Sequence, residues 1–146
     1  MPFSRPPLVV GPGAHAAPDA RRWVHARLHE IGRDELIETA ELAISELVAN
    51  AFLHGTAPIS LCLRGTADAP RIEVHDTSPT PPRLPDGEAT SVWATEGRGL
   101  SIVSRASRAW GVLLEDGGKT MWFEPAPDLS EDGVDAVIGD RRTSSR

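Results

Sequence analysis

The 146 residues of the chain suffice for one domain, and a domain of this length buries about two-thirds of the surface that its unfolded form exposes. The formal net charge is −6 and the basic residues are scattered, which argues against nucleic-acid binding through a basic face. The single cysteine, Cys62, excludes an internal disulfide, no apolar run is long enough to span a membrane, and the first residues lack the pattern of a secretory signal. We therefore expect a soluble, cytoplasmic protein that binds neither nucleic acid nor membranes directly.

The first part of the chain predicts a short strand followed by two helices. Residues 1–15 read as an N-terminal extension in which a short apolar patch between prolines suits one edge strand. Apolar residues recur every three or four positions over residues 16–31 and again from about residue 34 to residue 54, as in amphipathic helices. Gly32 and Gly55 follow these segments, at positions where glycine commonly ends a helix.

The middle of the chain predicts two strands and a long loop. Residues 58–65 and 71–76 alternate between apolar and polar side chains, as half-buried strands do. Residues 77–96 are rich in proline and have little periodicity. A loop of this length inside a compact domain is usually functional.

The last part predicts a helix over residues 99–109 and two strands within residues 110–124. The chain then turns polar, so we expect a disordered tail over residues 126–146. The element order predicts an α+β fold over residues 16–125, a two-layer sandwich with helices on one face of a mixed, mostly antiparallel sheet.

A carboxylate and a carboxamide interrupt the apolar second helix. Glu46 and Asn50 are four positions apart, on one flank of the buried stripe. Oxygen ligands of this kind suit Mg²⁺, which takes few protein ligands and keeps several waters. In isolation a solvated helix flank would be the better interpretation of this pair, so the hypothesis of a site depends on residues later in the chain.

Two further features occur in order after this pair. Asp76 ends a predicted strand, where its carboxylate could accept a hydrogen bond from an amine such as that of adenine. Gly97, Arg98, Gly99 and Leu100 open the next helix, where glycines leave backbone N–H groups free to bind phosphate. Alone, Asp76 is more typical of a turn and the glycines fit a helix start without a ligand, but together the three features predict a nucleotide pocket.

Four segments, SELVANAFLHG, VHDTSP, GRGLSIV and GGKTMWF, resemble the nucleotide-binding motifs of the GHKL ATPases, which share the Bergerat fold. The resemblance covers roughly residues 20 to 125 and is nearest to the small anti-sigma-factor serine kinases and their bacterial relatives. It implies that Asn50 coordinates Mg²⁺ bridging the phosphates of ATP. It also implies that Glu46 is the general base for a serine hydroxyl or for water.

The resemblance assigns the remaining site residues as well. Asp76 would hold the adenine amine with support from Thr120, and Gly97, Arg98, Gly99 and Leu100 would cover the phosphates. The family usually has two glycines shortly after its Asp, whereas this chain has Ser78 and Thr80 at those positions. By this resemblance, Ser78 would take the first glycine's place beside the nucleotide.

The function implied is that of an ATP- and Mg²⁺-dependent serine/threonine kinase that regulates transcription. It would phosphorylate a Ser of an anti-anti-sigma-type protein, or sequester a sigma factor, and relatives of this kind form homodimers. The alternative is a catalytically weak, nucleotide-dependent protein-binding module, which the missing glycines favour. A split histidine kinase fits less well because no helix pair carrying a phospho-acceptor His is evident.

Two other patterns have simpler interpretations. Gly118-Lys119-Thr120 imitates the end of a P-loop, but the earlier glycine of that motif is missing and a strand, not a helix, is predicted to follow. His25 and His29 are one helical turn apart, as metal ligands can be, but no third ligand is evident and an exposed helix face is favoured.

Overall fold

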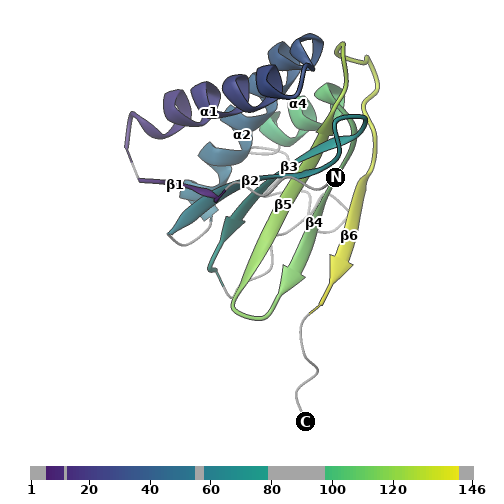
Figure 1. Cartoon of the computed structure of the whole chain (residues 1–146). Helices are drawn as coiled ribbons and strands as arrows, with labels where there is room; N and C mark the ends of the chain where they lie inside the picture. Colours follow the sequence, from purple (N-terminus) through teal and green to yellow (C-terminus); the bar gives the residue numbers. More distant parts are fainter. Residues whose placement is uncertain (1–5, 12, 55–57, 79–97, 142–146) are drawn as a thin grey trace.

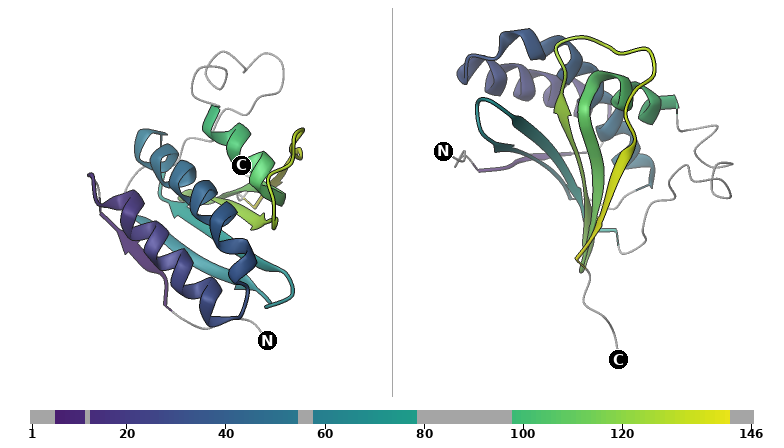
Figure 2. Two further views of the ribbon diagram at one scale, coloured as in Figure 1. Left: turned by 90° about the horizontal axis from the view of Figure 1, so that it is seen from above. Right: turned by 90° about the vertical axis from the view of Figure 1, so that its right-hand side faces the viewer.

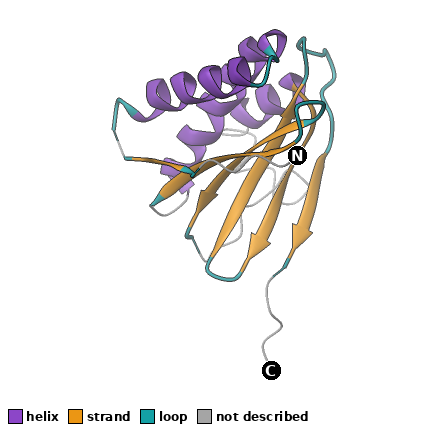
Figure 3. Cartoon of the chain, in the orientation of Figure 1, coloured by secondary structure: helices purple, strands orange, loops and turns teal. Residues whose placement is uncertain are grey.

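A sheet and a layer of helices make up the structure. The computed structural model describes residues 6–11, 13–54, 58–78 and 98–141. Within these residues six strands form one sheet in the order β1-β2-β3-β5-β4-β6, and the helices cover one face of it (Figure 1, Figure 2 and Figure 3). Neighbouring strands are antiparallel except for the parallel pair β4 and β6. The predicted two-layer α+β sandwich with a mixed, mostly antiparallel sheet is therefore confirmed.

The elements follow the predicted order, and one strand is added at the end. Their bounds are β1 (Leu8–Val10), α1 (Ala16–Glu30), the short 3-10 helix η1 (Asp34–Leu36), α2 (Ile37–His54), β2 (Ile59–Gly65), β3 (Pro70–Asp76), α4 (Arg98–Ala106), β4 (Ser107–Glu115), β5 (Gly118–Pro125) and β6 (Ala136–Asp140).

The two long helices bury the apolar stripes that their periodicity predicts. Ala20, Val24 and Leu28 of α1 are fully buried against α2 and the sheet. Gly32 has a φ of 75°, a left-handed conformation that glycine adopts at little cost, and it ends the first helix as expected. Within the described residues no helix is both long and apolar enough to cross a membrane.

The two central strands present different chemistry on their two faces. On the helix side, Ile72 and Val74 of β3 pair with Phe123 and Met121 of β5 and join the hydrophobic core. On the opposite face the same two strands carry polar and charged side chains together with one aromatic ring, Trp122. This alternation decides which candidate site residues can meet, because neighbours along a strand point to opposite faces.

The segment after residue 125 is ordered as far as residue 141, which corrects the expected disordered tail. β6 pairs in parallel with β4, from Trp110 opposite Ala136 to Leu114 opposite Asp140. The Trp110 indole N–H donates to the Val134 carbonyl at 2.8 Å, and Val134 and Ala136 pack against the core. A few apolar residues in a polar segment suffice here because the edge of β4 supplies the backbone partners. Residues 142–146 lie outside the described residues.

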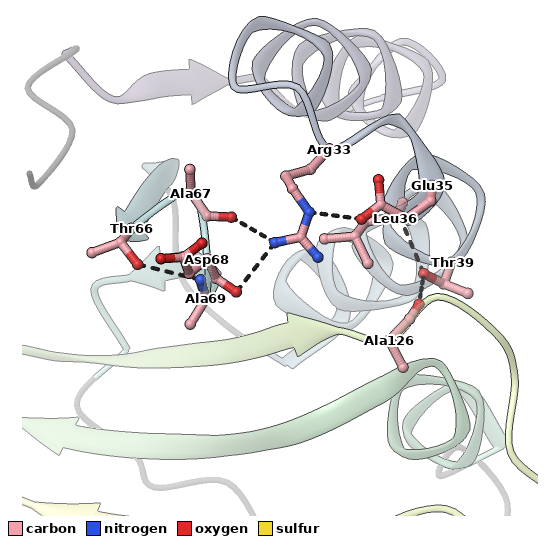
Figure 4. Close-up of polar contacts among 9 residues, drawn as sticks. All are labelled: Arg33, Glu35, Leu36, Thr39, Thr66, Ala67, Asp68, Ala69 and Ala126. Atoms are coloured by element: carbon pink, nitrogen blue, oxygen red, sulfur yellow. Dashed lines mark hydrogen bonds and ion pairs between the residues drawn. The ribbon is translucent and has the colours of Figure 1, made fainter.

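Polar contacts fix the end of the sandwich at which β3 begins (Figure 4). Arg33 donates from one guanidinium nitrogen to the carbonyls of Ala67 and Asp68, at 2.5 and 3.1 Å, in the turn between β2 and β3. The Thr39 hydroxyl donates to the Ala126 carbonyl at 2.5 Å, just after β5. β3 runs away from this anchored end, so its last residue, Asp76, lies at the opposite end of the sandwich.

Candidate functional site

Helix α2 contributes Glu46 and Asn50 to the candidate site. The flanking residues Leu47 and Val48 are each 1% exposed and hold the helix on the core, which leaves Glu46 and Asn50 half-buried one turn apart. Glu46 has no hydrogen-bond or ion-pair partner within the described part of the chain. This position makes Glu46 a candidate general base by geometry.

Asn50 is oriented by a contact with the sheet beneath it. Its amide nitrogen lies 3.5 Å from the sulfur of Met121, a weak hydrogen bond that leaves the amide oxygen without a described partner. The described residues contain no group of three His, Cys, Asp or Glu side chains that could hold a metal ion. Mg²⁺ in nucleotide sites usually takes one or two protein ligands and completes its coordination with phosphates and water, a requirement that the amide oxygen of Asn50 suits.

Asp76 at the end of β3 is buried, and its carboxylate forms an ion pair with Lys119 of β5. The two residues are register partners, and their side chains are each 3% exposed. The Lys119 ammonium lies 3.1 Å from Oδ1 and 2.9 Å from Oδ2 of Asp76. The backbone N–H of Ser78 donates to Oδ1 at 2.8 Å. The carboxylate predicted to hold a base amine is thus already a hydrogen-bond acceptor for two groups of the protein.

These residues from α2 and the sheet lie at one place in the fold. Met121, which Asn50 contacts, is opposite Val74, and two residues further along the same ladder Lys119 is opposite Asp76. Two residues along a strand span roughly 7 Å and return to the same face. The structure therefore brings Asn50 and Asp76 to the helix-covered side at one end of the central strands, and Glu46 lies one helical turn from Asn50 along α2.

Thr120 does not join Asp76. Its hydroxyl donates to a carboxylate oxygen of Glu115 at 2.9 Å and lies 2.5 Å from Nδ1 of His75. Both contacts are on the face of the sheet that the helices leave uncovered, because Thr120 is one residue from Lys119 and so points the other way. The support that Thr120 was expected to give to an adenine contact has no basis in this geometry.

Helix α4 contributes backbone groups at its start. Leu100 is 4% exposed and packs into the hydrophobic core, so its side chain does not face a ligand. The first turn contains Gly99, and the free N–H groups of such a turn attract anions. Gly97, the side chain of Arg98 and the predicted loop from residue 79 on, with Thr80, lie outside the described residues.

The uncovered face of the sheet carries a second polar cluster around His75. Nε2 of His75 lies 3.1 Å from a Glu73 carboxylate oxygen. A hydrogen bond with Cys62, then the one with Glu73, raises the pKa of His75 from 6.5 to about 9 despite partial burial. Burial raises the pKa of Glu73, but the contacts with His75 and Arg64 outweigh it and the pKa lies below 4.5. The imidazole is therefore protonated at neutral pH.

This cluster borders a groove that no sequence motif indicated. The groove has a volume of about 640 Å³, and Arg64, Glu73, His75 and Trp122 are among its lining residues. Arg71 stacks on the Trp122 ring, 3.8 Å from its centroid, and also pairs with Glu124 at 3.0 Å. The alternating pattern of β3 and β5 could have indicated a polar outer face, but not its concave shape.

The two alternative motifs have the ordinary roles expected of them. His25 pairs with Glu41 and His29 with Asp34, at 3.0 and 2.9 Å, so the two rings are not turned toward a shared ion. Residues 118–120 begin β5 instead of preceding a helix, which excludes the P-loop. Lys119 of this motif is instead the ion-pair partner of Asp76.

Comparison with known families identifies the kind of domain that the chain contains. No curated protein matches the chain. A family model described as a histidine kinase-like ATPase domain matches residues 13–124, from the turn before α1 to the end of β5. A domain of this kind indicates an ATP-binding regulatory function. Since the match spans most of its length, the chain belongs to the histidine kinase-like ATPase domain family of the GHKL superfamily.

Proposed function

We propose that this protein is an ATP-dependent serine kinase that modifies a partner protein. The observation that carries the proposal is the half-buried carboxylate of Glu46, which has no partner among the described residues and lies one helical turn from an Asn50 amide oxygen that likewise has none there. A carboxylate that can accept the proton of the nucleophile, next to a ligand for the cation that binds the phosphates, suits phosphoryl transfer.

In the proposed reaction, Glu46 accepts the proton of the attacking serine hydroxyl. The serine oxygen forms a bond to the γ-phosphorus as the bond from that phosphorus to the bridging oxygen breaks, and the electron pair leaves with ADP. Asn50 would be the protein ligand of Mg²⁺, which would neutralise charge on the phosphates. The N–H groups at the start of α4 would hold phosphate oxygens.

The partner is proposed from the resemblance to anti-sigma-factor kinases. It would be an anti-anti-sigma-type protein that receives the phosphate, or a sigma factor that the chain sequesters in order to regulate transcription. A homodimer is proposed on the same ground, and sedimentation analysis of the purified chain tests it.

The test separates binding from chemistry. Calorimetric titration of ATP with and without Mg²⁺ should give Mg²⁺-dependent binding that Asn50→Ala weakens. Glu46→Gln should bind ATP as wild type does, yet lose about 10²- to 10⁴-fold in transfer of γ-labelled phosphate to water or to serine of a candidate partner. Glu38→Gln, a carboxylate variant in the first turn of the same helix, is the matched control and should change neither. Full transfer by Glu46→Gln would refute the assignment of the base.

The second candidate is a nucleotide-dependent binding module with little catalysis. The occupation of Asp76 by Lys119 favours it, because an adenine contact at this carboxylate is not freely available. Nucleotide binding without label on any acceptor, by wild type and Glu46→Gln alike, would support this module. Label that resists acid marks phosphoserine and excludes the chemistry of a histidine kinase.

A further inference from the structure

Both oxygens of the buried Asp76 carboxylate already have donors from the protein. Oδ1 accepts from the Ser78 N–H at 2.8 Å and lies 3.1 Å from the Lys119 ammonium, and Oδ2 lies 2.9 Å from the same ammonium. Both side chains are 3% exposed, so water does not compete for these contacts. The ammonium bridges both oxygens of the group.

An exocyclic amine of a base and a lysine ammonium offer the same chemistry to a carboxylate. Each is an N–H donor, and the ammonium also carries the compensating charge that a buried carboxylate needs. The ammonium and the Ser78 N–H take three of the roughly four acceptor positions of this carboxylate. Because both side chains are also only 3% exposed, we expect a base amine to reach these oxygens by taking the place of the ammonium.

We propose that Lys119 is an intramolecular competitor for the base-binding carboxylate, so that a nucleotide base reaches Asp76 only by displacing the lysine ammonium. The proposal rests on the proposed function and deepens it by naming the residue that sets the affinity and base preference of the site. In wild type the base amine gains little, since one donor replaces another. Without the ammonium, the amine would meet a buried carboxylate that lacks a charged donor.

The expected change in ATP affinity follows from the free energy that a hydrogen bond to a charged group contributes. Replacing Lys119 by Met removes the competitor but keeps an unbranched side chain of similar length. ATP should then bind about 10- to 100-fold more tightly than it binds wild type. Purine riboside triphosphate, which lacks the 6-amino group, should bind both proteins equally well. Lys119→Arg retains a competing cation and should bind ATP about as weakly as wild type.

A second measurement uses wild type itself, because Lys119 is the sole lysine of the chain. An acetylating reagent should modify the buried Lys119 slowly in the free protein, and peptide mass analysis separates this site from the N-terminal amine. Saturating ATP with Mg²⁺ should increase the rate of Lys119 acetylation several-fold, whereas purine riboside triphosphate should not. This measurement remains decisive if Lys119→Met does not fold.

The outcomes separate this inference from the proposed function. Binding of ATP to wild type with unchanged Lys119 acetylation, or weaker ATP binding by Lys119→Met, would overturn the inference and leave the kinase proposal standing. Absence of ATP binding to wild type, Lys119→Met and Lys119→Arg at high protein concentration would refute the proposed function, and the inference with it. Binding by Lys119→Met alone would support both.

Discussion

The buried ion pair between Asp76 and Lys119 gives the sharpest prediction for stability. Lys119→Met leaves a carboxylate that is 3% exposed with only the Ser78 N–H as a described donor. Removing one member of such a pair typically costs about 3 to 5 kcal/mol in the free energy of unfolding. We expect Lys119→Met and Asp76→Val each to lose this much, measured by urea unfolding.

The double variant tests whether the loss comes from the unpaired charge. With both groups gone no charge is buried, and the remaining penalty is the Ser78 N–H without its acceptor, about 1 to 3 kcal/mol. The stability that the double variant loses should therefore be smaller than the sum of the two single losses by at least about 2 kcal/mol.

An exposed pair provides the matched control for this cycle. Arg64 and Glu73 lie 3.5 Å apart with side chains 57% and 17% exposed, and a pair of this kind contributes at most about 1 kcal/mol. Arg64→Met should therefore change stability little. A loss of under about 1 kcal/mol in Lys119→Met would refute the reasoning, because the carboxylate would then have found water or another partner.

Three further predictions concern the uncovered face and the last strand. The pKa of His75 is about 9 in the folded protein against an ordinary value of 6.5, so the stability that its protonation contributes is complete below pH 6.5 and is lost as the pH rises through 9. Allowing for partial exposure, this contribution to the free energy of unfolding is about 1 to 2 kcal/mol. The variant His75→Gln should therefore show a free energy of unfolding that changes less between these pH values. Cys62→Ala should lower the His75 pKa, followed by NMR titration of the ring. Gly111→Ala should destabilise by about 1 to 3 kcal/mol in thermal unfolding, because the added Cβ would lie 2.1 Å from the Val137 carbonyl oxygen of β6; unchanged stability would contradict the pairing of β6 with β4.

The local sequence pattern was sufficient to predict most of the fold. The helices α1, which ends at Glu30, and α2, which ends at His54, and the alternating strands β2 and β3 were predictable because their hydrophobic periodicity reflects burial directly. The last strand was not, because residues 136–140 lie in a polar segment and become a strand only by pairing with β4, a contact distant in sequence. Average composition cannot reveal a partner of that kind.

The site was predictable in its parts but not in its connections. Glu46 and Asn50 could be placed on one flank of a helix from spacing alone. The position of Asp76 was also predictable, but its partner depended on which strand lies beside β3 and in which register. Met121 and Phe123 are buried on the helix side, and the same alternation puts Lys119 there and Thr120 on the other face. A difference of one position along β5 thus separates Thr120, which was expected to support the adenine contact, from Lys119, which contacts Asp76.

Binding and chemistry are proposed to depend on different residues of this site, which gives the last prediction. In the proposed scheme, Lys119 controls access to Asp76 on β3, whereas Glu46 on α2 acts only when the serine proton is transferred. The double variant Glu46→Gln with Lys119→Met should therefore bind ATP as tightly as Lys119→Met, yet transfer γ-labelled phosphate about 10²- to 10⁴-fold more slowly than that single variant. Equal transfer by the two would mean that Glu46 is not the base. Loss of the tighter binding in the double variant would mean that Glu46 also contributes to holding the nucleotide, because independent residues have additive effects.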